Sequence, residues 1–352
     1  MAINFPEEQL NSHFGYFPGQ PGQTLDNGAW LIIRKLGWGP RSSVWFAFDV
    51  KDIHNSVAIK ILTVEATQSP SAKSELALLE KFHAKPGLPW FRGHFYEEGL
   101  KGKHLCLLLG TLGPSVETLR TSNEEGAYLP LHIVKQVVSS GLSAICNLHR
   151  ENVYSGAIKA EHLLFPCHEY YGGESYNYEE VKDEDGTTYP VVRSEPLGTV
   201  GEVVWNESKE RFASQNVTLT SIGSHNVGDP VSAADFDGPL TPPEVLTGGK
   251  IGLKVDIFQL GLMIFHLLTG APLLDEAAYK ADPNKVLSNE LKNMAKRFKS
   301  NGRVAEPDIP LTVAILQEML ALNPIARPAA EKLLEKKWIE EGDVCSCGWC
   351  AA

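Results

Sequence analysis

The sequence is short of the features that mark several common protein classes. Six cysteines in 352 residues are too few for a disulfide framework, so a reducing compartment is expected. No apolar run reaches about 18 residues, so we expect no membrane span. The first residues show no charged start followed by an apolar stretch, so no secretory signal is predicted. Together these absences predict an intracellular protein of the cytoplasm or nucleus.

The chain also has fewer positively charged residues than negatively charged ones. The chain has 32 Lys and Arg against 43 Asp and Glu, a formal net charge of −11. That balance argues against general binding to a phosphate backbone and predicts no direct nucleic-acid partner, although a local basic patch can persist within the average. Hydrophobic residues make up 43% and charged residues 21%, as in ordinary globular proteins. The length predicts one large two-lobed domain or two domains.

Periodicity divides the chain into a strand-rich part and a helical part. Short β-branched and aromatic runs predict three antiparallel strands between Trp30 and Leu62, and a further strand over 104–110. Five segments show the helical spacing of apolar residues. One of them lies between the predicted strands and four follow them: 71–82, 131–151, 255–270, 311–322 and 328–339. The 255–270 segment is apolar nearly all round and predicts a buried core helix. We expect an α+β fold with a small antiparallel β lobe and a larger helical lobe.

The predicted boundaries follow this change of pattern. They are an extended lead-in over 1–28, a small lobe over 29–112, a large lobe over 113–341 with an insertion at 166–215, and a Cys-rich tail over 342–352. The insertion contains an acidic, Tyr-rich stretch without periodicity, which predicts an inserted loop.

The first half contains a candidate phosphate-binding pattern. Gly37 and Gly39 lie between two predicted strands with Ser42 nearby, and small residues let the backbone N–H groups approach a phosphate closely. Alone, this pattern also fits a plain hairpin turn. The next strand ends in VAIK, where Lys60 can pair with phosphates and with Glu75 of the following helix. The alternative to phosphate binding is that Lys60 and Glu75 form an ordinary surface ion pair.

These motifs resemble those of eukaryotic protein kinases, and more narrowly the SR-protein kinases in their fungal form. LGWGPRSSVW is similar to that group's glycine loop, GYFPGQPGQTLDNGAW to its N-terminal segment, and HLCLLLGTLG to its hinge strand. The resemblance covers about residues 15–340. It implies a bilobal protein-kinase-like fold and a nucleotide-binding set consisting of Gly37, Gly39, Ser42, Val44, Ala58, Lys60, Glu75, Leu109, Gly110 and Leu112.

The catalytic half departs from that family's pattern. LHRENVYSGAIKAEHLLF aligns without gaps, which puts Ala157 at the position of the catalytic base and keeps Lys159. The two metal-binding positions become His162 and Ser221. Ala157 cannot accept a proton, and neither an imidazole nor a neutral hydroxyl is a good ligand for the hard Mg²⁺ ion. No metal site is therefore predicted.

Two segments look like the missing motifs but lie in the wrong places. HRE at 149–151 falls at the end of the predicted helix, and DFDG at 235–238 lies too close to TPPE at 241–244 to leave room for an activation segment. The architectural residues are kept. Glu244 is expected to pair with Arg327, and Asp256 to hold the backbone of the catalytic loop.

The tail residues Cys345, Cys347 and Cys350 lack a partnering pair for zinc, so an inert tail is expected, with metal, lipid or redox chemistry as alternatives. The functional hypothesis is a pseudokinase that acts as a protein-binding or scaffold module. No cofactor is firmly predicted, and the one considered is ATP without Mg²⁺. The partner is a protein, with basic or Arg/Ser-rich proteins as candidates. The alternatives are an active Ser/Thr kinase that uses displaced groups such as Asp235 or Glu161, and a different transferase.

Overall fold

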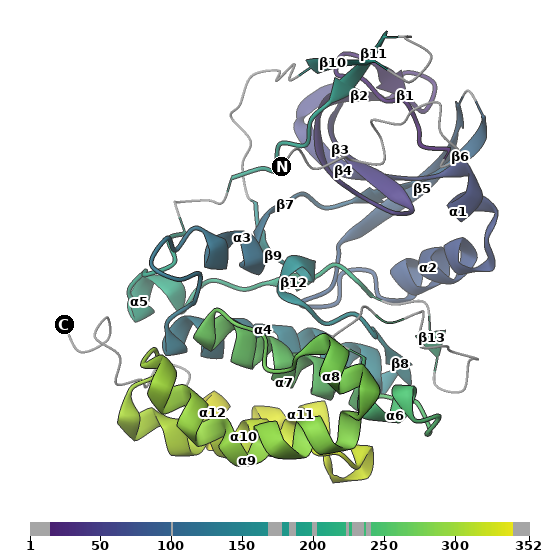
Figure 1. The fold of residues 1–352 in the computed structure, drawn as a ribbon. Coiled ribbons are helices and arrows are strands. Elements are labelled where there is room, and N and C mark those ends of the chain that lie inside the picture. The colour runs from purple at the N-terminus through teal and green to yellow at the C-terminus, as the bar shows by residue number, and fades with distance from the viewer. Residues whose placement is uncertain are drawn as a thin grey trace. The chain divides into compact units, whose positions relative to one another are not determined.

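The computed structural model describes residues 15–99, 101–167, 178–182, 188–198, 203–222, 225–226, 236 and 241–340. The chain divides into two compact units (Figure 1). Unit 1 comprises 1–84, 89–113 and 166–200, and unit 2 comprises 85–88, 114–165 and 201–352.

Unit 1 is built on one antiparallel six-stranded sheet in the order β1-β2-β3-β4-β6-β5. Alternating large apolar residues of β3, β4 and β6 bury one face, with Trp45, Ile59 and Cys106 at its centre, which is why these runs form strands. The strands are β1 (Thr24–Leu25), β2 (Trp30–Gly39), β3 (Ser42–Asp49), β4 (Asp52–Leu62), β5 (Phe91–Gly99) and β6 (Gly102–Leu109). Two helices, α1 (Val64–Gln68) and α2 (Pro70–Lys81), follow β4.

The lead-in is more than an extended tail where the structure describes it. Tyr16, Phe17 and Leu25 are buried, and β1 pairs with the start of β2. The Tyr16 hydroxyl donates a hydrogen bond to the carbonyl of Gly39 at 2.7 Å. The lead-in therefore packs on the sheet and braces the turn between β2 and β3.

The predicted insertion also differs from expectation. Residues 166–200 group with unit 1 rather than with the helical unit. Within them, β10 (Tyr178–Lys182) and β11 (Thr188–Val192) form an antiparallel hairpin, where the sequence suggested a loop without structure. The residues after the hairpin pack on the sheet, because Leu197 lies in a buried cluster with Ile33 and Phe46. The described residues of the insertion up to 198 thus extend unit 1, whereas those over 203–215 belong to unit 2.

Unit 2 is mainly helical. Its central helix, α7, buries every residue except Lys254 and His266, as its continuous apolar sequence predicts. It contacts α4 and α10, and ends at Gly270, whose φ of 74° favours glycine. The helices are α3 (Val116–Thr121), α4 (Leu131–Arg150), α5 (Lys209–Phe212), α6 (Pro243–Leu246), α7 (Lys254–Thr269), α8 (Glu276–Ala281), α9 (Pro283–Asn301), α10 (Ile309–Met319), α11 (Ala330–Leu334) and α12 (Lys337–Glu340).

Several segments of unit 2 differ from the sequence-based prediction. Residues 328–339 form two short helices, α11 and α12, rather than one. The long α9 and the short α8 before it were not predicted. Short strands complete the elements: β7 (Leu112–Ser115), β8 (Val153–Tyr154) paired with β13 (His225–Asn226), and β9 (Leu163–Pro166) paired with β12 (Thr218–Leu219). Among the described residues, no helix is both long and apolar enough to cross a membrane.

Candidate functional site

The turn between β2 and β3 carries the candidate glycine loop. Neither glycine has a positive φ, and a Cβ atom built on Gly37 or Gly39 would meet no atom within 4 Å. The fold of unit 1 therefore gives no steric reason for glycine at either position. Open space beside bare backbone is the feature that a phosphate group needs, so these residues fit the phosphates of a nucleotide.

Lys60 and Glu75 form an ion pair that joins β4 to α2. Both side chains are about one-quarter exposed. The β2–β3 turn is tied to the same helix, because Arg41 donates hydrogen bonds to Ser69 and Ser71 at the start of α2. The glycine loop, the lysine and the glutamate are thus connected within unit 1.

The segment compared with a hinge continues from β6. Leu109 lies opposite Ala58 in the β4–β6 register, and the amide of Gly110 donates to the carbonyl of Trp90 at 2.8 Å. Val44 lies opposite Lys60 on the neighbouring strand pair, and Ser42 is buried opposite Leu62. All the residues that the resemblance assigns to nucleotide binding up to Gly110 therefore lie in unit 1. Glu75 is on α2, and the others are on connected strands or at their ends.

In unit 2, the segment from Ser155 to Ile158 is held by the buried first turns of α7. The carboxylate of Asp256 accepts hydrogen bonds from the amides of Ser155 and Gly156, at 3.0 and 2.8 Å. The side-chain nitrogen of Gln259 donates to the carbonyl of Gly156 at 2.8 Å, and its side-chain oxygen accepts from the backbone amide of Ile158 at 3.0 Å. Gly156 has φ 68°, which favours glycine. The backbone of this loop is therefore fixed independently of the side chains it presents.

Those side chains offer little reactive chemistry. Position 157, which the resemblance assigns to the base, presents only the methyl group of Ala157. The Nδ1 atom of His162 lies 2.9 Å from the carbonyl of Ala157. Because a carbonyl can only accept, Nδ1 carries the proton and donates. His162 therefore uses one ring nitrogen to close the loop on itself.

The position compared with the metal loop follows β12. The carbonyl of Ser221 accepts a hydrogen bond from the Ser155 hydroxyl at 2.6 Å, and Ile222 is buried. The set of Ala157, His162 and Ser221 supplies no carboxylate or carboxamide oxygen, so these residues do not fit Mg²⁺. Among the described residues, no group of three or more His, Cys, Asp or Glu side chains is arranged to hold a metal ion.

The ion pair expected between Glu244 and Arg327 is formed. Two hydrogen bonds of 2.7 and 2.8 Å join the guanidinium to the carboxylate, and the side chains are 0% and 5% exposed for Arg327 and Glu244. Arg327 also donates to the carbonyls of Ala321 and Lys254. Removing one partner of a buried pair leaves an uncompensated charge and costs about 3–5 kcal/mol. This pair is a structural support of unit 2.

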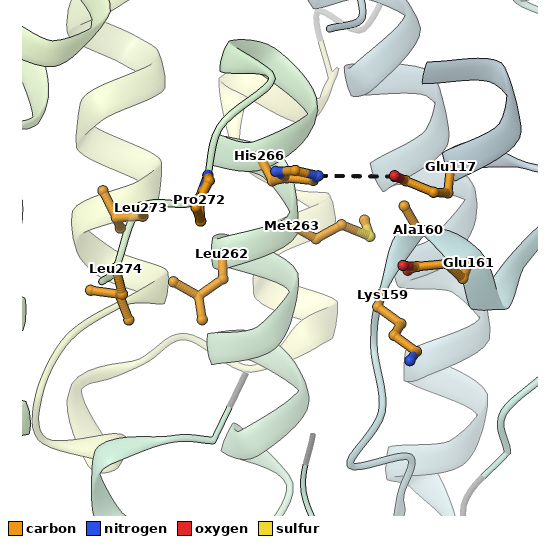
Figure 2. Close-up of a pocket in the computed structure, with 10 residues that line it drawn as sticks. All are labelled: Glu117, Lys159, Ala160, Glu161, Leu262, Met263, His266, Pro272, Leu273 and Leu274. Carbon is orange, nitrogen blue, oxygen red and sulfur yellow. Dashed lines mark ion pairs between the residues drawn. The ribbon is translucent and has the colours of Figure 1, made fainter. Parts of the chain in front are cut away.

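A cavity of about 230 Å³ lies within unit 2, beside the loop that carries Lys159. Figure 2 shows its two sides, with the acidic side chains of Glu117 and Glu161 opposite an apolar wall. The lining residues are Glu117 of α3, Lys159 to Glu161, then Leu262, Met263 and His266 of α7, and Pro272 to Leu274. The cavity can enclose one long side chain whose stem is apolar and whose head is cationic.

His266 and Glu117 both line the cavity and lie close together, with 4.0 Å between Nε2 and Oε2 (Figure 2). Burial lowers the pKa of His266, and the nearby Arg120 guanidinium acts in the same direction against the pull of Glu117. Glu117 is itself hydrogen-bonded to Arg120. Lys159 and Glu161 were identified from the sequence, but Glu117 and His266 were not, because they come from α3 and α7 and no local motif connects them.

The two decoy segments have other roles. His149 and Arg150 end α4, and His149 lies 2.9 Å from the Asp256 carboxylate. Of the DFDG segment only Phe236 is described, and it packs with Tyr154 and Val255. Asp235 lies outside the described residues, as does the tail with Cys345, Cys347 and Cys350.

The architecture defines a class of fold. An antiparallel β unit is followed by a mainly helical unit, and residues 231–339 match the family model described as "Protein kinase domain". The predicted fold class, α+β and protein-kinase-like, is confirmed.

The curated relatives of the chain belong to one group of protein kinases. The chain is 25% identical over 321 residues to the serine/threonine-protein kinase SRPK of Physarum polycephalum, an alignment that covers 83% of this chain and 73% of the relative. It is 28% identical over 171 residues to the serine/threonine-protein kinase SKY1 of Saccharomyces cerevisiae and 31% identical over 159 residues to the SRSF protein kinase 3 of Mus musculus. Those alignments cover 45% and 43% of this chain but only 23% and 27% of the relatives. The similarity to SR-protein kinases is therefore supported.

Proposed function

We propose that the protein is a pseudokinase of the SR-protein-kinase-like group, which binds a protein partner and does not transfer phosphate. Nucleotide binding, where it occurs, is weak and independent of metal, and uses Gly37, Gly39, Lys60 and the segment from Leu109 to Leu112. The relatives are named as kinases; the proposal for this chain depends on its own residues.

One observation carries this proposal. The loop from Ser155 to Ile158 is held by four hydrogen bonds from Asp256 and Gln259, yet the base position is a methyl group. His162 closes onto the carbonyl of Ala157 rather than offering an oxygen ligand. A loop that keeps its support but lacks a proton acceptor and hard-metal ligands favours binding over catalysis, because loss of such groups costs orders of magnitude in rate.

The cavity beside this loop supports a basic partner. Its lining carries Glu117 and Glu161, with Lys159 beside them, and its apolar wall carries Leu262, Leu273 and Leu274. Two carboxylates against one ammonium, next to an apolar wall, suit the stem and head of an Arg or Lys side chain. We propose basic or Arg/Ser-rich protein segments as the partners. The net charge of −11 favours their approach over that of acidic proteins.

The competing proposal is an active Ser/Thr kinase with displaced catalytic groups. Glu161 is the described carboxylate nearest in sequence to the base position, and it is exposed at the rim of the cavity. In that case Glu161 would take the substrate proton, and ATP with a divalent metal would be required.

A thermal-shift titration with ATP, with and without Mg²⁺, separates the two. The pseudokinase proposal expects the same small rise in Tm under both conditions, and no rise for Lys60→Met. A control variant, Lys103→Met, removes an exposed lysine of β6 and leaves the shift unchanged. Phosphate transfer from ATP to an Arg/Ser peptide is then measured with each protein. Metal-dependent transfer that disappears in Glu161→Gln would overturn the proposal in favour of the active kinase.

A further inference from the structure

Helix α9 carries a straight row of four lysines along one face. Lys285, Lys292, Lys296 and Lys299 are spaced by 7, 4 and 3 residues. At 3.6 residues per turn these positions fall within about 60° of one another, and they span about 21 Å along the helix axis. All four are exposed. We call this row, defined by these four residues, the lysine row.

The orientation of the lysine row is set by the opposite face of the helix. Leu287, Met294 and Phe298 are 0% exposed and lie about half a turn away from the lysines. Phe298 packs against Phe265 of α7, with 5.2 Å between the ring centroids. The helix cannot rotate without exposing this apolar face, so the lysine row is held toward solvent.

The lysine row has no acidic neighbours that neutralise it. Within the described part of unit 2, no carboxylate forms an ion pair with any of the four lysines, whereas Lys280, Lys332 and Lys336 each have one. The helix's own Glu290 lies on another face and is paired with Arg297 at 2.6 Å. Asn289 and Asn293, which lie beside the lysine row, are neutral and polar. The acidic residue of this face is the N-cap Asp282, whose carboxylate accepts a hydrogen bond from the backbone amide of Lys285. The row is thus a local positive patch on an acidic protein.

We propose that the lysine row binds the sugar–phosphate backbone of a nucleic acid. Three properties favour this partner. The row is linear and one residue wide, as a single backbone strand is. It has no exposed apolar side chains, which a membrane-surface helix needs. It concentrates four positive charges over about 21 Å of helix, so it fits a polyanion better than a single charged group.

Nucleic acid is such a polyanion. Each strand carries one phosphate per about 3.4 Å of axis, a duplex one per about 1.7 Å, and both release condensed counterions when lysines bind. The aromatic residue of α9, Phe298, is buried on the opposite face and cannot stack on a base, so we expect binding without sequence preference. The proposal departs from the expectation of no direct nucleic-acid partner, which was based on the average charge and not on its distribution. It does not depend on the pseudokinase proposal.

The test is fluorescence polarisation of labelled 20-nucleotide RNA, single-stranded and duplex, at 50 to 200 mM NaCl. For four contacts to a single strand, we expect a slope of about −2.8 for log affinity against log salt, a loss of about 50-fold over this range. The double variant Lys292→Gln/Lys296→Gln should halve the slope to about −1.4. Glutamine favours helix, so the fold of α9 is retained, which far-UV circular dichroism checks.

The matched control is Lys332→Gln/Lys336→Gln, which removes the same charge from α11 and the turn after it, and should leave the slope near −2.8. An equal loss in both double variants would contradict the proposal, since it would reflect net charge alone. Absence of saturable RNA binding at 50 mM NaCl would overturn it as well. So would tighter binding of a polyglutamate peptide that requires Lys292 and Lys296, because the partner would then be an acidic protein segment.

Discussion

At the scale of single residues, unit 2 contains the buried polar groups that support its fold, whereas the base position is an alanine. Glu244, Asp256 and Arg327 are buried, and each makes at least two hydrogen bonds. Their roles were predictable from sequence because each belongs to a motif with fixed spacing. Ala157 and His162 were also located by alignment with a motif. That the His162 ring closes onto the carbonyl of Ala157 was not predictable, because it depends on the path of the intervening turn.

A buried histidine in unit 1 should make stability depend on pH. His104 is 1% exposed, and its Nδ1 atom lies 2.7 Å from the carbonyl of Leu62. Burial lowers its pKa, more than this hydrogen bond and the nearby Glu97 and Glu98 raise it. The unfolded chain therefore binds the proton first as pH falls below about 6.5, and the folded state loses stability from there downward until the lowered folded pKa is passed.

We expect urea unfolding to show lower stability at pH 5.5 than at pH 7.5. In His104→Asn, whose amide can still donate to Leu62, the loss should shrink by up to about 1 kcal/mol. His54 is exposed, so His54→Asn serves as the control and should keep the wild-type slope. An unchanged pH slope in His104→Asn would contradict the assignment of the titration to this residue.

At the scale of elements, the glycine loop offers a test that separates fold from function. Since a Cβ atom at Gly37 or Gly39 meets no atom within 4 Å and neither φ is positive, alanine should be tolerated there. We expect Gly37→Ala/Gly39→Ala to raise stability by up to about 1 kcal/mol per site, because alanine loses less backbone entropy on folding. The same variant should weaken any ATP-induced rise in Tm, because the methyl groups occupy the space beside the backbone.

A thermal-shift assay with and without ATP measures both effects. Gly22 is a suitable control, since it also has open space but a φ of 85°, so Gly22→Ala should lower stability. Destabilisation by Gly37→Ala/Gly39→Ala would show that the glycines serve the fold instead.

Elements with a strong pattern were the ones predicted. The strands from Trp30 to Leu62 and the apolar helix α7 appear where expected. Helix α9 was not predicted, although Leu287, Leu291, Met294 and Phe298 are spaced as one helical face. Its many polar residues make the segment hydrophilic on average, so the narrow apolar face was overlooked. The 328–339 segment was predicted as one helix but is two, since the turn at Glu335 and Lys336 interrupts the regular hydrogen bonds.

At the scale of the whole molecule, the pseudokinase proposal implies that a few side chains separate this protein from an enzyme. The triple variant Ala157→Asp/His162→Asn/Ser221→Asp returns a proton acceptor and two oxygen ligands for Mg²⁺ to a loop that Asp256 and Gln259 already hold. We expect it to transfer phosphate from ATP to an Arg/Ser peptide in the presence of Mg²⁺, at least tenfold above the wild-type background.

Adding Lys60→Met to the triple variant should abolish the gain, since Lys60 is expected to hold the phosphates. The matched control, Ala157→Asn with the other two changes, supplies no base. A folded triple variant with no gain would contradict the idea that only reactive groups are missing.

The resemblance to protein kinases predicted the Glu244–Arg327 ion pair and the contacts of Asp256 with the loop. The amino-acid sequence alone was sufficient to predict the α+β class and the strand-rich and helical parts. Those features depend on local periodicity and spacing, which a single chain displays directly. Only the tertiary structure revealed the cavity of Glu117, Glu161 and His266, the packing of residues 192–197 on the sheet, and the outward direction of the lysine row. Each of these depends on which distant segments pack together, and that is set by burial across the whole core rather than by neighbours in sequence.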